Sequence, residues 1–333
     1  MSRRTTTIAV LGDGGWGTTL AIHLHRLGHR VRWWGAFADY VKVLDRRREN
    51  IKFLPGIRIP RALQITSDLS EALAPAQLVV LAVPSQYLRT IVRKLKGYPL
   101  NTTAFLSVTK GLEMHTHKRM SEVIKEEIGH VQVAVLSGPN IASEIAQGHP
   151  ASSVVASKHP AFATKVQQWL MSEQLRIYTS SDVIGVELGG ALKNPVAIAA
   201  GLGDGLGCGA NAKAALIARG VMEMARLGVA MGARPETFWG LSGLGDLITT
   251  CLGGRNRWLG EQLGKGRSLS AVLNGMEMVI EGVDTTKAAR SLSRRFRVEL
   301  PIIEQVYAIL FRRKDPQTAL RALMRRACKS ESA

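Results

Sequence analysis

The chain has 333 residues, of which 46% are hydrophobic and 21% are charged. This composition supports a sizeable buried core and excludes an intrinsically disordered protein, and the length suits one large domain or two ordinary ones. No apolar run approaches a membrane span, and residues 1–12 lack the pattern of a signal peptide. We therefore expect a cytoplasmic protein without stable membrane insertion.

The charge balance is strongly basic, with 44 Lys and Arg against 26 Asp and Glu and a formal net charge of +18. Such an excess suits anionic partners, from phosphorylated metabolites to nucleic acid. The basic runs, such as Arg46–Arg48, carry no interleaved aromatic residues, so we do not expect nucleic-acid binding. The three cysteines lie far apart, and the pairs His23/His25 and His115/His117 are two residues apart, so on a helix their side chains would point in different directions. We predict neither a disulfide framework nor a metal site.

The first half of the chain alternates short apolar, β-branched runs with helix-like segments such as Trp16–Leu27. Continuous apolar runs indicate strands that are covered on both faces, and their alternation with helices predicts a mostly parallel, doubly wound α/β sheet. The predicted strands are Thr7–Leu11, His29–Trp34, Leu78–Val83, Ala104–Val108, Val131–Leu136, Ser153–Ala156 and Arg176–Tyr178.

After about Ser181 strand signals disappear and helical periodicity takes over. We expect a dinucleotide-binding type of domain over residues 1–182, an all-helical domain over 183–333, and a site in the cleft between them. The glycine-rich stretch Gly201–Gly209 follows a helix, and we interpret it as a flexible turn without a ligand. Further predicted helices are Lys213–Leu227, Ala271–Val279, Thr285–Ser293 and Ile302–Leu310.

A glycine-rich motif, Gly12-x-Gly14-x-x-Gly17, follows the first predicted strand directly and opens a helix. In this context the first glycine permits a tight turn, the second lets a pyrophosphate approach the backbone, and the third allows the helix to pack on the strand. The anion then rests on the helix N-terminus. The motif predicts a nicotinamide dinucleotide site, and the alternative is a glycine-rich turn without a ligand.

The choice between NAD and NADP stays open. A NAD site usually carries an acid at the end of the second strand, which holds the ribose 2′-hydroxyl. Here that strand is followed by Gly35, Ala36 and Phe37, and the first acid is Asp39. A 2′-phosphate would meet no repulsion there, and the Arg46–Arg48 run is available to attract it.

Two further groups of residues carry chemistry. Lys193 lies in a long apolar stretch with Glu187 and Asn194, where a buried ammonium needs a partner, although a lysine can also extend its amine to solvent. The second group, residues 243–256, places Asp246, Thr250, Arg255 and Asn256 close together in sequence. An acid, a hydroxyl, an arginine and an amide suit a phosphorylated hydroxy compound.

The chain resembles the bacterial-type NAD(P)-dependent glycerol-3-phosphate dehydrogenases over nearly its whole length. The resemblance rests on stretches in the family's order, which are GDGGWGT, FLPGIRIP, LAVPSQ, SVTKGLE, LSGPNIASEIAQG, ELGGALKNPVAIAAG, GLGDLITTC with GRN, and VIEGV. It implies a Rossmann-type domain followed by an all-α domain. The implied enzyme interconverts sn-glycerol 3-phosphate and dihydroxyacetone phosphate with NAD or NADP and supplies glycerol phosphate for phospholipid synthesis.

The resemblance also implies roles for individual residues. Lys193 would be the general acid and base, with Lys110, Asp246, Asn194 and Thr250 as the other catalytic residues. The implied substrate-binding residues are Lys110, Gly138, Asn140, Lys193, Asp246, Arg255 and Asn256. The implied cofactor-binding residues are Gly12, Gly14, Gly15, Trp16, Gly17, Tyr87, Lys110, Ala142, Arg255, Val279 and Glu281.

The sequence departs from the commoner family pattern at three positions. Asn140 replaces a serine or threonine, Gly254 replaces a serine, and Gly15 stands at a variable loop position. These departures bear on the affinity for substrate and cofactor more than on the identity of the enzyme. Two alternatives remain: another two-domain dehydrogenase of 6-phosphogluconate or 3-hydroxyacid type, and a non-catalytic protein that has kept the fold. A helical second domain often dimerises, so a homodimer is one expectation.

Overall fold

The computed structural model describes residues 5–74, 76–100, 103–274, 279–328 and 330–331. The chain divides into two compact units. The first comprises Met1–Glu113 and Lys118–Glu187, and the second comprises Met114–His117 and Leu188–Ala333.

The first unit is built on an eight-stranded sheet with the order β10-β9-β8-β7-β6-β1-β2-β5. All neighbouring strands in it are parallel except β8 and β9, which are antiparallel. A separate antiparallel pair consists of β3 and β4. The strands are β1 Thr7–Leu11, β2 Arg30–Trp34, β3 Glu49–Asn50, β4 Leu54–Arg58, β5 Gln64–Thr66, β6 Leu78–Leu81, β7 Ala104–Ser107, β8 Val133–Ser137, β9 Ala151–Ala156 and β10 Leu175–Ser180.

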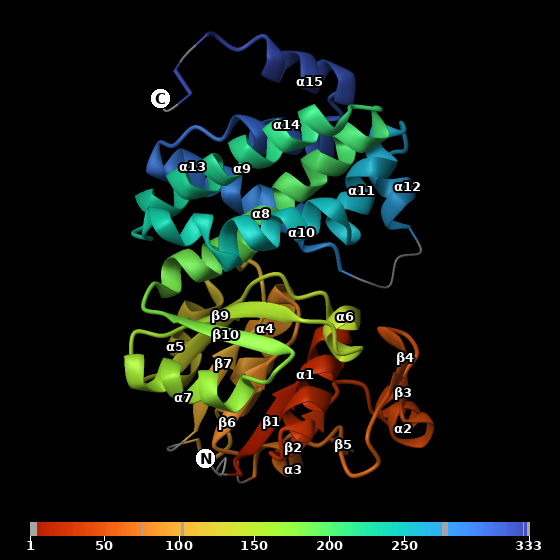
Figure 1. Ribbon diagram of the computed structural model, residues 1–333, viewed down its shortest axis with the longest axis vertical. Helices are drawn as coiled ribbons and strands as arrows, with labels where there is room; N and C mark the ends of the chain where they lie inside the picture. The colour runs from red at the N-terminus through yellow and green to blue at the C-terminus, as the bar shows by residue number, and fades with distance from the viewer. Residues whose placement is uncertain (1–4, 75, 101–102, 275–278, 329, 332–333) are drawn as a thin grey trace. The chain divides into compact units, whose positions relative to one another are not determined.

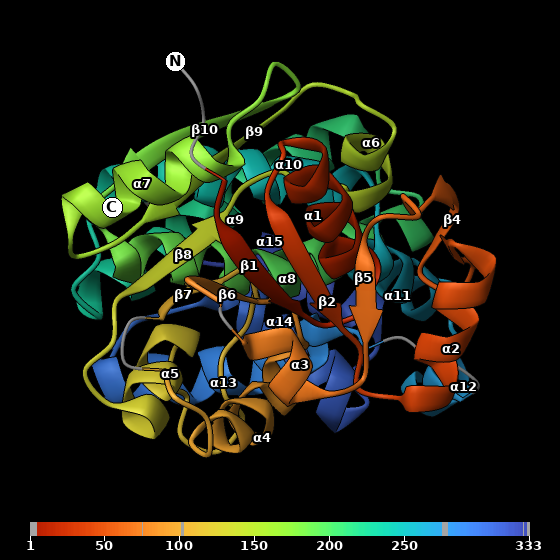
Figure 2. The same ribbon diagram turned by 90° about the horizontal axis from the view of Figure 1, so that it is seen from below.

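Helices cover both faces of this sheet, with α1, α6 and α7 on one side and α3, α4 and α5 on the other (Figures 1 and 2). Side chains on a strand alternate between faces, so Ile8 and Val10 of β1 join one core cluster while Ala9 and Leu11 join the other. The helices are α1 Gly15–Arg26, α2 Ala38–Arg47, α3 Leu69–Leu73, α4 Ser85–Leu95, α5 Met120–Ile128, α6 Ala142–Ala146 and α7 Pro160–Leu170.

The doubly wound, mostly parallel sheet predicted from the sequence is confirmed, and each of the seven predicted strands is present with small shifts at its ends. The additional strands β3, β4 and β5 were not predicted. They are two, five and three residues long, and β4 contains Pro55 and Gly56. Such short or interrupted segments carry too little periodicity to be recognised from the sequence.

The described part of the second unit has no strand, as predicted. Its first long helix, α8, runs from Val183 to Gly205 and is long and apolar enough to cross a membrane, so the expectation that no apolar run approaches a membrane span was wrong. However, 83% of its most apolar window is buried inside the protein. The other helices are α9 Ala210–Ala230, α10 Asp246–Leu252, α11 Arg255–Gly264, α12 Leu269–Leu273, α13 Glu281–Phe296, α14 Pro301–Arg312 and α15 Pro316–Met324, with the short turns η1 Pro235–Trp239 and η2 Leu241–Gly245.

The interpretation of Gly201–Gly209 as a turn was wrong over its first half, because α8 continues to Gly205. A Cβ atom on Gly201 would lie 1.9 Å from the carbonyl oxygen of Arg257, and one on Gly205 would lie 2.4 Å from that of Glu261. These glycines therefore let the backbone of α8 approach the backbone of α11. Gly201 and Gly205 reflect helix packing, whereas Gly207 and Gly209 lie in the turn between α8 and α9.

The helix predicted over Ala271–Val279 was also wrong in its extent. The structure ends α12 at Leu273, and Val279 is not helical. The intervening residues 275–278 lie outside the described residues.

Candidate active site

The glycine-rich motif forms the turn between β1 and α1. Gly12 has φ of +125°, and a Cβ there would lie 2.5 Å from the carbonyl oxygen of Ala82, so this position requires glycine. A Cβ on Gly17 would lie 2.1 Å from the carbonyl oxygen of Gly12. By contrast, Gly14 has open space where its side chain would stand, and no side chain caps the N-terminus of α1. A pyrophosphate can therefore approach this backbone.

Two buried side chains outside the motif hold this turn in place. Trp33 donates its indole N–H to the carbonyl oxygen of Gly12 at 2.9 Å. The Nδ2 atom of Asn50, which is fully buried, donates to the carbonyl oxygen of Asp13 at 2.8 Å and to the hydroxyl of Thr18 at 2.7 Å. Sequence reasoning missed Asn50, and its position just before the family stretch FLPGIRIP was the available signal.

Several buried polar atoms near the carboxyl ends of β1, β7 and β8 have no hydrogen-bond partner among the described residues. They are Asp13 Oδ2, Trp16 Nε1, Ser107 Oγ, Ser137 Oγ and Asn140 Nδ2. Native proteins pair nearly all such atoms, and ligands of open α/β sheets bind at this edge. Unpaired donors and acceptors together with the open glycine turn fit a polar dinucleotide.

The remaining predicted residues of the first unit lie after strands of the same sheet. Lys110 follows β7 and donates its Nζ to the carbonyl oxygen of Gly138 at 2.9 Å. Asn140 follows β8, and its Oδ1 accepts a hydrogen bond from the hydroxyl of Ser153. Tyr87, in the first turn of α4, is exposed, and Ala142 opens α6 and accepts a hydrogen bond from Thr19.

Two of the three departures from the family pattern have a local structural reason. A Cβ on Gly15 would lie 2.7 Å from the carbonyl oxygen of Phe53, so this turn packs too closely for a side chain unless the backbone shifts. Gly254, at the N-terminus of α11, has φ of +94°, a conformation that favours glycine.

The Arg46–Arg48 run ends α2 and stands two residues before Asn50, which reaches the glycine-rich turn. Arg48 donates to Asp45 at 2.5 Å and to the carbonyl oxygen of Leu63 at 2.8 Å. These contacts hold Arg48, and the attraction of a 2′-phosphate by this run stays a prediction.

In the second unit, Lys193 lies on α8 with only 8% of its side chain exposed. Its ammonium donates to Asp246 Oδ1 at 2.5 Å and to the hydroxyl of Thr250 at 2.6 Å, both from α10. Burial excludes the alternative in which the amine extends into solvent. The neighbouring Cys251 has its pKa raised by burial to about 12, so it is a neutral thiol at neutral pH.

A chain of hydrogen bonds joins α8, α11 and the start of α13. Asn256 Nδ2 donates to Asn194 Oδ1 at 2.9 Å, and Asn256 Oδ1 accepts from the backbone N–H of Gly282 at 3.0 Å. Val279 and Glu281 lie beside Gly282 in sequence and are partly buried. Arg255 is exposed at the first position of α11. This helix end combines free backbone N–H groups with a guanidinium, which suits a phosphate.

Glu187 does not join Lys193, although both lie on α8. Its carboxylate accepts hydrogen bonds from Arg119 at 2.6 Å and from the backbone N–H and hydroxyl of Ser121, both at 2.7 Å. Burial raises the pKa of Glu187, and Arg119 opposes that shift. Glu187 therefore attaches the start of α8 to α5 and has a structural role.

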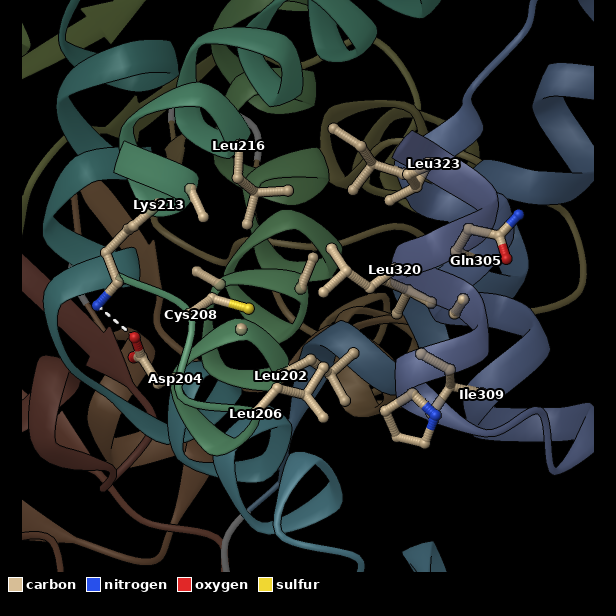
Figure 3. Close-up of a pocket in the computed structure, with 18 residues that line it drawn as sticks. Leu202, Asp204, Leu206, Cys208, Lys213, Leu216, Gln305, Ile309, Leu320 and Leu323 are labelled. Atoms are coloured by element: carbon tan, nitrogen blue, oxygen red, sulfur yellow. Dashed lines mark ion pairs between the residues drawn. The ribbon is translucent and has the colours of Figure 1, made fainter. Parts of the chain in front are cut away.

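The second unit also contains an apolar cavity of about 100 Å³ between α8, α9, α14 and α15 (Figure 3). Leucines such as Leu202, Leu216 and Leu320 line it, and Lys213 forms an ion pair with Asp204 at 2.7 Å. Lys193, Asp246 and Thr250 are not among its lining residues. This cavity is separate from the Lys193 group, and its lining is mostly apolar apart from the paired Asp204 and Lys213.

Comparisons with known proteins agree with these features. Two family models match, described as the NAD-dependent glycerol-3-phosphate dehydrogenase N-terminus over residues 7–163 and C-terminus over residues 182–321. A glycerol-3-phosphate dehydrogenase [NAD(P)+] of Chlorobium phaeobacteroides is 47% identical, covering 97% of this chain and 98% of the relative. One of Geobacillus kaustophilus is also 47% identical, covering 97% and 96%.

Among solved structures, a glycerol-3-phosphate dehydrogenase from Coxiella burnetii is similar with a TM-score of 0.93 and 37% identity, covering 97% of this chain and 99% of that one. The yeast Saccharomyces cerevisiae glycerol-3-phosphate dehydrogenase gives a TM-score of 0.82 at 29% identity, covering 96% and 99%. Both halves of the chain match in the family's order and over almost its full length. The chain therefore belongs to the NAD-dependent glycerol-3-phosphate dehydrogenase family.

Proposed function

We propose that the chain catalyses the NAD(P)-dependent interconversion of sn-glycerol 3-phosphate and dihydroxyacetone phosphate. The reaction supplies glycerol phosphate for phospholipid synthesis. The observation that carries the proposal is the buried ion pair of Lys193 with Asp246, found in a chain that also has an open glycine turn for a dinucleotide. Burying an ammonium group is costly, and a buried titratable group with a specific charge partner marks a candidate functional site.

Lys193 is the general acid and base in this proposal. In the reducing direction a bound nicotinamide would supply the hydride that C2 of the substrate receives. Lys193 Nζ donates its proton to the C2 oxygen, and in the oxidising direction the neutral amine takes that proton back. Asp246 and Thr250 fix the position of Nζ through the hydrogen bonds described above. The positive charge also stabilises an alkoxide that develops on the substrate.

The phosphate of the substrate is bound at the N-terminus of α11. Arg255 provides a forked donor, and the uncapped helix end provides backbone N–H groups. Asn256 and Asn194 hold each other through their side-chain amides, which orients them toward the substrate's hydroxyl groups. Gly138, Asn140 and Lys110 are the substrate-binding residues that we assign to the first unit.

The first unit binds the dinucleotide through Gly12, Gly14, Gly15, Trp16 and Gly17. The unpaired Trp16 Nε1 and Asn140 Nδ2 support this assignment, because a bound polar ligand would satisfy them. Tyr87, Lys110 and Ala142 complete the cofactor contacts of this unit. Val279, Glu281 and Arg255 are the cofactor contacts that we assign to the second unit.

Substrate profiling tests the proposed function. The protein is mixed with NADH or NADPH and with dihydroxyacetone phosphate, and nicotinamide absorbance is followed. The oxidising direction is assayed with NAD⁺ or NADP⁺ and with glycerol 3-phosphate, 6-phosphogluconate and 3-hydroxyacids. We expect turnover of dihydroxyacetone phosphate and glycerol 3-phosphate only. The Arg255 end of α11 selects a phosphate, which 3-hydroxyacids lack, and the proposed substrate carries no carboxylate, which 6-phosphogluconate has. Turnover of 6-phosphogluconate or a 3-hydroxyacid in preference would contradict the assignment.

A further inference from the structure

The carboxyl group of Asp13, a residue of the glycine-rich turn, lies at the end of the second strand, β2. Gly35 directly follows β2, and a Cβ on it would lie 2.8 Å from Oδ2 of Asp13 and 2.7 Å from Cγ2 of Val41. The Asp13 carboxyl group therefore fills the space that a side chain at position 35 would take. NAD-binding sheets commonly carry their ribose-binding acid at this strand end. Here the glycine-rich turn places a carboxyl group at this position, in the sequence Gly12-Asp13-Gly14.

The Asp13 carboxyl group lacks a full set of partners. Its Oδ2 is buried without a hydrogen-bond partner among the described residues. Burial raises the pKa of this carboxyl, and its own backbone N–H and the charge of Lys52 act in the opposite direction. A buried acceptor without a donor costs free energy, and a hydroxyl that donates to it removes that cost. Asp13 as a whole is only partly buried, although its Oδ2 atom is covered.

The backbone holds Asp13 in this position. Asn50 donates to the Asp13 carbonyl oxygen at 2.8 Å, and Trp33 anchors the preceding residue, Gly12, at 2.9 Å. Asp13 therefore stands at a fixed place between the glycine turn and the end of β2.

The other charged groups around this strand end are Lys52, whose charge acts on the Asp13 carboxyl, Asp39, and the arginines that end α2. The next acid in sequence, Asp39, has a fully solvent-exposed side chain at 3.4 Å from Lys42. These arginines stand at positions 46–48.

We propose that Asp13 binds the 2′-hydroxyl of the adenosine ribose and thereby makes this enzyme prefer NAD over NADP. The proposal rests on the dinucleotide binding of the proposed function. A ribose hydroxyl donates a hydrogen bond to the carboxylate. A 2′-phosphate carries about two negative charges near neutral pH and would face the carboxylate in a partly desolvated site. The discriminating acid is thus present, although the strand that normally provides it ends in glycine.

Cofactor binding in the absence of substrate tests this inference. NADH and NADPH are titrated by fluorescence into the wild type, Asp13→Ala and Asp13→Asn, with thermal unfolding of each variant as a check of folding. We expect wild type to bind NADH at least about tenfold more tightly than NADPH, and Asp13→Ala to lose about tenfold in NADH affinity. Both variants should bind NADPH more tightly than wild type does, because the carboxylate charge is gone.

Asp39→Asn is the matched control, since Asp39 is the other acid of this region and lies in solvent. It should leave both affinities unchanged. The inference is overturned if wild type binds NADPH as tightly as NADH, or if Asp13→Asn changes both affinities by the same factor. A wild type that selects NADH but does not reduce dihydroxyacetone phosphate would instead contradict the proposed function and support the role of Asp13.

Discussion

At the scale of single residues, the burial of Lys193 determines how strongly its ion-pair partner Asp246 affects the protein. Only 2% of the Asp246 side chain is exposed, so the ion pair is shielded from water on both sides. Removing one partner of such a pair leaves an uncompensated charge in a poorly solvated place. Asp246 is therefore expected to affect both stability and catalysis.

Asp246→Asn should lower the free energy of unfolding by about 3 kcal/mol, because the Lys193 ammonium loses its counter-charge. Denaturant unfolding measures this change. The double variant Lys193→Met with Asp246→Asn is the control, and it should recover part of the lost stability because no unpaired charge remains. Equal stability of Asp246→Asn and wild type would show that the pair contributes nothing to folding.

Residues that bear on cofactor choice show what the sequence could and could not predict. The absence of an acid after the second strand was visible in the sequence. The proximity of Asp13 to Gly35 was not, because it depends on the parallel pairing of β1 with β2. Likewise, Asn50 reaches the glycine turn from a strand far along the chain. Contacts of this kind arise from tertiary packing, which no local pattern records.

At the scale of secondary structure, continuous apolar runs predicted the sheet well because strands covered on both faces have a distinctive composition. Glycines were harder to interpret. Whether a glycine at the end of a helix marks a turn or a close helix contact depends on the neighbouring helix. In α8 the glycines allow a close contact with the backbone of α11, and the helix continues through Gly201 and Gly203 to Gly205.

Gly201 and Gly203 form a matched pair for testing this packing. Gly201→Ala should destabilise the protein by about 2 kcal/mol or more, because the new methyl group would lie 1.9 Å from the Arg257 carbonyl oxygen and force α8 from α11. Gly203→Ala meets only Cys208 Cβ at 3.8 Å and should be neutral or stabilising by up to about 1 kcal/mol through its helix propensity. Thermal unfolding compares the two, and similar melting temperatures would contradict close backbone packing.

At the scale of the whole molecule, stability should depend on pH through a buried acid that the proposed chemistry does not use. Glu223 of α9 is 2% exposed and accepts hydrogen bonds from the backbone N–H groups of Ile302 and Ile303 at the start of α14. Burial raises its pKa from 4.5 to about 7. Between these two pH values the folded protein holds a proton that the unfolded chain has released.

The contribution of Glu223 to stability is therefore fully present below about pH 4.5 and is lost as pH rises through about 7. The full shift corresponds to about 3 kcal/mol. Comparing the free energy of unfolding of wild type and Glu223→Gln from pH 4.5 to 8 isolates this contribution, because the other titrating groups are shared. We expect wild type to lose stability relative to the variant as pH rises. A constant difference between the two would contradict a raised pKa.

In the proposed mechanism Lys193 transfers the proton, and the first unit provides most of the cofactor contacts. Comparing Lys193→Met with wild type tests this most directly. Both proteins are titrated with NADH and assayed with dihydroxyacetone phosphate at saturating cofactor. We predict unchanged NADH affinity and a kcat lower by about 10²–10⁴-fold in the variant. A Lys193→Met protein that retains the wild-type kcat would contradict the role of Lys193 as the general acid and base.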